Sequence, residues 1–271
     1  MKNTSRIKIL ILLALCLLFS LPTFTKGGER IVPSDLDIYL CIGQSNMAGR
    51  AVLTPEVMDT LSNVYLLNDK DNFEPAVNPL NRYSTVRKDI SMQRLGPSYA
   101  FAKEMVKKTK RPLGLVVNAR GGSSINSWLK GSKDGYYEQA LARVRIALQQ
   151  GGTLRAILWH QGEANSAQPE AYKEKLVAMV NAFREDLGLP NLPIIVGQIS
   201  QWDKWTKRET GTAPFNKMIT EVASFVPYSD WVSTKGLDCY KDETDPHFGT
   251  KGQLLLGKRY AQKAWKFYKH K

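Results

Sequence analysis

The chain has 271 residues, 43% of them hydrophobic and 23% charged, which is close to the average of soluble globular proteins. No repeat, low-complexity stretch or Pro/Gly/Ser-rich linker divides it, and this favours one domain of medium size. The formal net charge of +13 favours anionic partners. The Lys and Arg residues are scattered, however, without a stacking-aromatic or helix-turn-helix pattern, so we expect no nucleic-acid partner.

Residues 1–26 have the features of a secretory signal peptide. Three basic residues precede an almost unbroken apolar run from Ile9 to Leu21, which is short for a membrane span, and a polar stretch follows. A membrane anchor that stays uncleaved is the alternative, because no strong small-x-small cleavage site is visible. We expect residues 27–271 to form a single exported domain, secreted or periplasmic, without stable membrane association. Removal of the leader takes away four basic residues and no acid, so the net charge falls from +13 to +9.

The first expected strand, residues 37–42, is a short apolar run that ends at Gly43 and is typical of a buried parallel strand. Ser45 follows it in the turn Gly43-Gln44-Ser45-Asn46-Met47. A serine at a strand's end can attack a carbonyl carbon while its own N–H holds the oxyanion. A plain helix-capping serine would suit the same turn.

The next segment, residues 50–95, is rich in Asn, Asp, Pro and Arg, and we expect mostly loop there. A helix is expected from Pro97, since proline suits the first turn. The densest basic cluster of the chain, within residues 103–111, is interpreted as the solvated side of that helix. A second strand is expected at residues 112–118.

Polar or glycine-rich loops follow the second and third expected strands. Gly121 and Gly122 let the backbone approach a bound group and point N–H donors at it, although a simple turn would explain them equally well. The Gly-Lys-Ser/Thr ending of a phosphate loop is absent. After the strand at residues 154–159 come three polar side chains that are costly to bury without partners, His160, Gln161 and Glu163.

The rest of the chain continues the alternation of helices and strands. Helices are expected at residues 136–150, 169–187 and 213–225, and strands at 192–199 and 231–234. A last helix, residues 250–268, should begin with a capping box between Thr250 and Gln253. This order predicts a parallel sheet covered by helices on both faces, with function at the carboxyl ends of the strands. His247, in Thr244-Asp245-Pro246-His247-Phe248, is the best candidate base.

Cysteine and histidine usage predicts neither a disulfide framework nor a metal site. Two cysteines, Cys41 and Cys239, remain after the leader, and the sequence leaves open whether they form a disulfide. The three histidines and these cysteines have no metal-ligand spacing, so we expect no metal or other cofactor.

Four motifs together resemble the sialate O-acetylesterase-like branch of the SGNH hydrolases, which contains the acetylxylan esterases of carbohydrate esterase family six. They are Gly43-Gln44-Ser45-Asn46-Met47, Gly121-Gly122-Ser123-Ser124-Ile125, Gln161-Gly162-Glu163 and Asp245-Pro246-His247-Phe248. The resemblance runs from about Asp37 to the C-terminal helix. It implies a three-layer, flavodoxin-like αβα sandwich, in agreement with the pattern of elements.

The resemblance also implies roles for individual residues. Ser45 would be the nucleophile and His247 its base, and the oxyanion hole would comprise the Ser45 amide, a Gly121 or Gly122 amide and the Gln161 side chain. The superfamily places an acid three positions before the histidine, where this chain has Thr244. Asp245 stands two positions before it and is our first candidate for the orienting acid, with Glu163 as the second.

The expected reaction is the release of acetate from an acetylated carbohydrate such as acetylxylan. Two alternatives stay open: a sialate O-acetylesterase on the same machinery, and a non-catalytic carbohydrate-binding relative. Three tryptophans, Trp128, Trp202 and Trp205, are candidates for a sugar-binding platform, and core packing is the alternative for each of them.

Overall fold

The computed structural model describes residues 32–208 and 211–269. The expected signal peptide lies outside the described residues and stays a prediction. Among the helices of the described segments, none has the length and apolar character needed to cross a bilayer.

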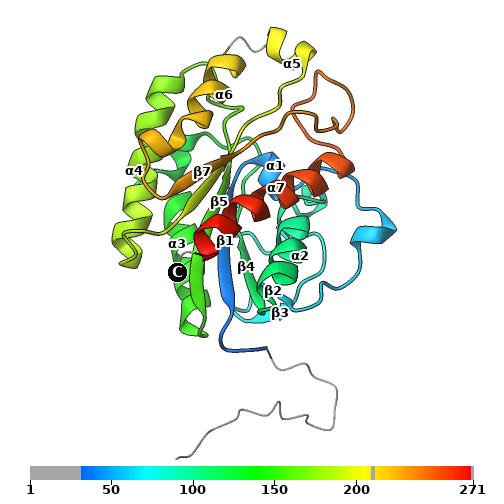
Figure 1. Ribbon diagram of the computed structural model, residues 1–271, viewed down its shortest axis with the longest axis vertical. Helices are drawn as coiled ribbons and strands as arrows, with labels where there is room; N and C mark the ends of the chain where they lie inside the picture. The colour runs from blue at the N-terminus through cyan, green and yellow to red at the C-terminus, as the bar shows by residue number, and fades with distance from the viewer. Residues whose placement is uncertain (1–31, 209–210, 270–271) are drawn as a thin grey trace, which may run out of the picture. The chain divides into compact units, whose positions relative to one another are not determined.

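One seven-stranded sheet forms the centre of the described domain, in the order β3-β2-β4-β1-β5-β6-β7 (Figure 1). All neighbouring pairs are parallel except β2 and β3, which are antiparallel. The strands are β1 (Asp37–Gly43), β2 (Val64–Leu67), β3 (Phe73–Pro75), β4 (Leu113–Val117), β5 (Thr153–His160), β6 (Ile194–Gly197) and β7 (Ser229–Val232).

Helices cover both faces of the sheet, so the predicted three-layer αβα fold is confirmed (Figure 1). One face packs against α3 (Tyr136–Gln149), α4 (Pro169–Leu187) and α6 (Thr212–Thr220). The other packs against α2 (Ser98–Thr109) and α7 (Thr250–Lys269). The shorter helices are α1 (Ser45–Ala48) and α5 (Asp203–Arg208), with 3-10 turns at Pro55–Val57, Ile90–Met92, Ile125–Trp128 and Val222–Ser224.

The central strand β1 supplies side chains to both cores. Ile38, Leu40 and Ile42 pack on the α3–α4–α6 side, while Tyr39 and Cys41 pack on the α2–α7 side. This is the alternation of a strand, with both faces apolar because both are covered. The burial fixes the register of β1, and therefore the point at which the chain leaves the sheet toward Ser45.

One expectation about local structure was incomplete and another was wrong. Residues 50–95 are mostly loop and turn as predicted, but they also contain the short strands β2 and β3; a four-residue strand between asparagines carries too little periodicity to be recognised. The last helix begins at Thr250 as predicted, but the capping box does not form. The Thr250 hydroxyl donates to the carbonyl of Val52, and the Gln253 amide donates to the carbonyl of Asn46. Cys41 and Cys239 are both free thiols.

Candidate active site

Ser45 begins α1 directly beyond the carboxyl end of β1 and is 5% exposed. The close approach of β1 to β5 requires Gly43, which has φ of 134° and lies against the backbone of His160, where a Cβ atom would collide. The turn after Gly43 therefore carries the serine over the strand ends. This is the edge at which open parallel sheets place their ligands.

His247 lies beside Ser45, although 202 positions separate them in the sequence. Its Nε2 atom is 2.9 Å from the Ser45 Oγ atom. The loop between β7 and α7 brings the histidine to this point, and its side chain is 24% exposed. The hydroxyl and the imidazole are thus within reach of a proton transfer.

Asp245 contacts the opposite side of the same imidazole. Its Oδ1 atom is 2.5 Å from His247 Nδ1 and also accepts a hydrogen bond from the His247 backbone N–H at 2.9 Å. A carboxylate at Nδ1 favours the tautomer with hydrogen on Nδ1, which leaves Nε2 free to accept a proton from Ser45. Thr244, at the superfamily's acid position, instead bonds to Asp242.

Burial lowers the pKa of His247 below its ordinary value. Asp245 opposes this shift, whereas the positive charges of Arg50 and Lys241 add to it. The imidazole is consequently neutral at neutral pH, the state that a general base needs.

Glu163, the second candidate for the orienting acid, lies against Asn46. Its Oε1 atom accepts a hydrogen bond from Asn46 Nδ2 at 2.7 Å. Asn46 also donates to the carbonyl of Pro246 and accepts from the backbone N–H of Phe248, so it ties the serine turn to the histidine loop. Burial of the Glu163 carboxyl raises its pKa to about 7, although its hydrogen bonds oppose the rise.

Three backbone N–H groups are candidates for an oxyanion hole, those of Ser45, Gly121 and Gly122. In the described part of the chain, none of them donates to another protein group. A Cβ atom on Gly121 would stand 3.8 Å from the Ser45 Cβ atom, so the glycine loop borders the nucleophile. Free donors next to a nucleophile are what a tetrahedral oxyanion requires.

The expectation that the Gln161 side chain belongs to the oxyanion hole is not met. Gln161 is fully buried, and its Nε2 atom donates to the Ser123 carbonyl at 3.0 Å and to Asn165 Oδ1 at 2.8 Å. Both amide hydrogens are therefore occupied. Gln161 instead holds the loop that follows the paired glycines, because Asn165 also accepts from the Ile125 N–H.

Arg50 is a site residue that the sequence did not single out. Its Nη1 atom donates to the carbonyls of Gly49 and Met92, and its Cζ atom would lie 3.4 Å from a Cβ atom on Gly121. Among the described residues, no carboxylate forms an ion pair with it. Its position directly after Gly49, in the continuation of the serine motif, is the only signal for it in the sequence.

Two of the three tryptophans considered for a sugar-binding platform belong to the core. Trp128 is fully buried and Trp205 is 5% exposed, so the alternative of core packing holds for both. Trp202 is half-buried and packs against Phe248. Large aromatic side chains beside strand ends often complete the core in this way.

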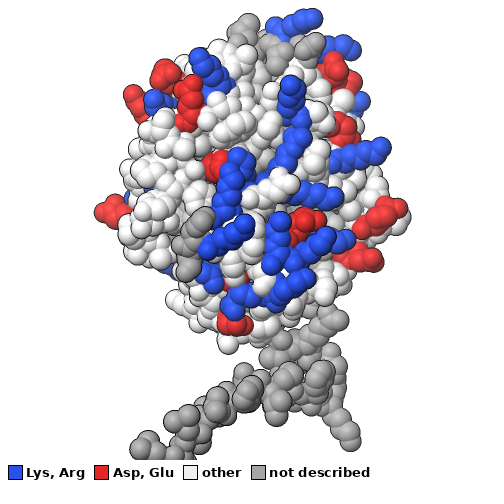
Figure 2. Space-filling model, in the orientation of Figure 1, with Lys and Arg blue, Asp and Glu red and all other residues white. Residues whose placement is uncertain are grey.

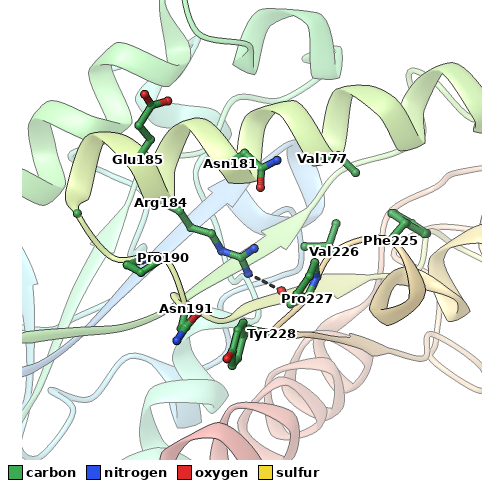
Figure 3. Close-up of a pocket in the computed structure, with 11 residues that line it drawn as sticks. Val177, Asn181, Arg184, Glu185, Pro190, Asn191, Phe225, Val226, Pro227 and Tyr228 are labelled. Atoms are coloured by element: carbon green, nitrogen blue, oxygen red, sulfur yellow. Dashed lines mark hydrogen bonds between the residues drawn. The ribbon is translucent and has the colours of Figure 1, made fainter.

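A cavity of about 720 Å³ lies apart from these residues, between the end of α4 and the segments that lead into β6 and β7 (Figure 3). In Figure 3 the Arg184 side chain extends from α4 to the Pro227 carbonyl, which accepts its hydrogen bond at 2.6 Å. The segments lead into the amino ends of the strands, the edge opposite Ser45. The cavity therefore takes no part in the chemistry at the serine.

Comparison with known proteins agrees with this geometry. A sequence model of the family described as carbohydrate esterase, sialic acid-specific acetylesterase, matches residues 35–266. The chain belongs to this family. It is thus an ester hydrolase, and more narrowly a carbohydrate acetylesterase.

The relatives of this carbohydrate acetylesterase share most of its length. A probable carbohydrate esterase of Arabidopsis thaliana is 30% identical over 250 residues, covering 83% of this chain and 88% of the relative. The X-ray structure of an Arabidopsis thaliana protein matches with a TM-score of 0.72 and 27% identity, covering 86% of this chain and 98% of the other. A carbohydrate acetylesterase of Xanthomonas citri matches in fold, with a TM-score of 0.64 and 19% identity, over 87% of this chain and 57% of its own.

Proposed function

We propose that this acetylesterase releases acetate from an acetylated polysaccharide such as acetylxylan through a serine acyl-enzyme, and that it acts outside the cytoplasm. The contact series Asp245–His247–Ser45 is the observation that carries the mechanism. It also argues against the non-catalytic alternative, since a binding protein has no need of a neutral imidazole bonded to a serine hydroxyl.

The first step forms the acyl-enzyme. His247 Nε2 takes the proton of Ser45 Oγ as this oxygen bonds to the acetyl carbonyl carbon, and the carbonyl oxygen becomes an oxyanion. The N–H groups of Ser45 and of Gly121 or Gly122 would hold the oxyanion. When the ester C–O bond breaks, the imidazolium gives its proton to the departing sugar hydroxyl.

The second step returns the enzyme to its starting state. His247 takes a proton from a water molecule, whose oxygen attacks the acetyl carbon of the acyl-enzyme. The bond to Ser45 Oγ breaks, the serine recovers its proton from the imidazolium, and acetate leaves. Asp245 stabilises the imidazolium in both steps without itself taking the proton.

A sialate O-acetylesterase is the second candidate, favoured by one observation. The Arg50 guanidinium next to the serine has hydrogen bonds to carbonyls only, so it could pair with the carboxylate of an acidic sugar such as 9-O-acetyl sialic acid. The two candidates differ in substrate and share the catalytic residues.

Acetate release from acetylated xylan, acetylated pectin and 9-O-acetyl sialosides decides between the substrates. We expect the largest kcat/KM on a polysaccharide, and a preference for the sialosides would favour the second candidate.

Ser45→Ala should lower turnover by several orders of magnitude on every substrate, because it removes the nucleophile, while the circular dichroism spectrum stays unchanged. A variant that kept a large part of wild-type turnover would exclude the serine mechanism. Export is tested separately, by sequencing the N-terminus of the mature protein.

A further inference from the structure

The surface above α2 and α7 is strongly basic (Figure 2). The two helices pack side by side over the same face of the sheet. The last helix contains six basic residues and no acid, and α2 contains three lysines and one glutamate. The basic cluster that the sequence placed on one solvated helix side is therefore part of a larger surface that α7 extends.

Part of this positive charge is neutralised within the protein. Lys263 and Lys266 form ion pairs with Asp230, at 2.7 and 3.0 Å. Arg111 pairs with Asp35 and Asp37.

Six further lysines of α2, of its C-terminal cap and of α7 are exposed, and none of these six forms an ion pair within the described segments. We call this set the α2–α7 face: Lys103, Lys107, Lys108, Lys110, Lys258 and Lys269. Like charges gathered on one surface repel one another and attract a polyanion.

An aromatic side chain lies within this group of cations. Trp265 is half-buried and stacks with Tyr268 at a centroid separation of 5.5 Å. The Nζ atoms of Lys108 and Lys269 lie 5.9 and 5.6 Å from the centre of the Trp265 ring. An aromatic ring gives a sugar an apolar surface to pack on, and the flanking ammonium groups are placed to pair with carboxylates.

We propose that the α2–α7 face is a docking surface for an anionic polysaccharide, with the lysines pairing with its carboxylates and Trp265 contacting a sugar ring. The choice of a carbohydrate partner rests on the proposed function. The geometry agrees with it, because α7 begins three residues after His247 and extends about 30 Å from there along the sheet. A polymer that runs along α7 toward its first turn can therefore extend to the sheet edge that carries Ser45.

The test is affinity electrophoresis in gels that contain polygalacturonate, with Ser45→Ala as the background so that turnover plays no part. We expect retention at low salt that weakens as salt rises, since exposed charges are screened beyond about 10 Å at 0.1 M ionic strength. Replacing Lys107, Lys108 and Lys258 by Gln should weaken binding at least tenfold. A control that replaces Lys133, Lys175 and Lys217, which lie outside α2 and α7, removes the same charge and should change binding less than twofold.

Further arms separate the outcomes. With Ser45 intact, both triple variants should hydrolyse 4-nitrophenyl acetate at the wild-type rate. The variant Trp265→Ala should weaken polygalacturonate binding three- to tenfold. Its melting temperature shows whether it is folded. Equal loss in both triple variants would mean that net charge alone acts, which overturns the proposal. Binding to vesicles of one part phosphatidylglycerol to three parts phosphatidylcholine, without binding to polygalacturonate, would also overturn it. Polygalacturonate binding without acetate release from any polysaccharide would refute the proposed function and leave the docking surface standing.

Discussion

Two carboxyl groups near Ser45 make different contacts, and these contacts predict different effects of mutation. Asp245 bonds to the imidazole of His247, whereas Glu163 bonds to the amide of Asn46. Asp245→Asn should lower kcat on 4-nitrophenyl acetate roughly 10³- to 10⁴-fold, because an amide at Nδ1 favours the wrong tautomer.

Glu163→Gln offers the matched comparison at the second carboxyl group. The new amide keeps an oxygen for Asn46, so we expect kcat within about tenfold of the wild type. If Glu163→Gln lowered kcat strongly and Asp245→Asn kept kcat near the wild-type value, the assignment of Asp245 as the orienting acid would be wrong.

The charges around His247 predict the pH dependence of activity. The imidazole must be neutral to accept the serine proton, so activity should be present above its pKa and lost as pH falls through it. Burial together with Arg50 and Lys241 lowers this pKa, so the midpoint of kcat/KM should lie below about 6.5. Lys241→Gln removes one positive charge and should move the midpoint upward. A midpoint unchanged or moved downward would contradict this electrostatic account.

Glu163 also predicts how stability depends on pH. Its pKa is raised from 4.5 in an exposed chain to about 7 in the folded protein, so the folded state holds the proton more tightly. This favourable contribution is complete below pH 4.5 and is lost as pH rises through 7. Its size is about 3 kcal/mol at most, at 1.36 kcal/mol for each pKa unit.

Glu163→Gln lacks this titration. The free energy of unfolding of the variant minus that of the wild type should therefore increase as the pH rises from 4.5 to 8. Urea denaturation at the two pH values measures the difference. A parallel pH dependence in the two proteins would show that Glu163 does not titrate in this range.

At the scale of elements, the packing of α7 on α2 depends on Gly257. A Cβ atom there would lie 2.7 Å from the Phe101 backbone nitrogen and 2.9 Å from the Ala100 Cβ atom. Alanine is favoured over glycine by about 1 kcal/mol inside an isolated helix, but overpacking costs typically 1–3 kcal/mol. We expect Gly257→Ala to lower the free energy of unfolding, and Lys258→Ala, on the exposed side, to leave it nearly unchanged. A more stable Gly257→Ala would mean that the helices do not approach this closely.

Most of the larger elements could be predicted from the sequence because each carries a strong local signal. The apolar run before Gly43 and the turn-spaced apolar residues of α4 are of this kind, and the ends of α4 are as expected. The strands β2 and β3 could not be predicted, since each has only three or four residues; β2 is fixed by pairing with β4, and the edge strand β3 by pairing with β2, and not by their own patterns.

The candidate active site shows the same distinction between features with a local sequence signal and features that depend on tertiary contacts. The residues that the serine mechanism needs come from recognisable motifs. Tertiary contacts decide the rest: Gln161 turns its amide to Ser123 and Asn165, and Gln253 reaches Asn46 instead of capping its own helix. The proximity of Arg50 to the glycine loop likewise exists only once β1 and β4 are paired. Propensity and spacing carry no information about such contacts.

At the scale of the whole described domain, the sheet separates three regions. The candidate catalytic residues lie at the carboxyl edge, the cavity near Arg184 lies at the amino edge, and the basic residues lie over α2 and α7 (Figure 1, Figure 2). Because the sheet is rigid and its two cores are separate, a charge change on α2 or α7 should leave the distance between Ser45 and His247 unchanged. Surface recognition and chemistry can therefore be altered independently.

The long separation in sequence between Ser45 and His247 has a consequence for the synthesis of the protein. The serine belongs to the first strand–helix unit and the histidine immediately precedes the last helix. A chain that leaves the ribosome or a translocation pore N-terminus first presents its nucleophile long before its base. Contacts between distant segments also form late, because closing a long loop costs entropy before any packing repays it. A nascent chain that does not yet contain His247 therefore has its nucleophile without its base and cannot carry out the serine mechanism.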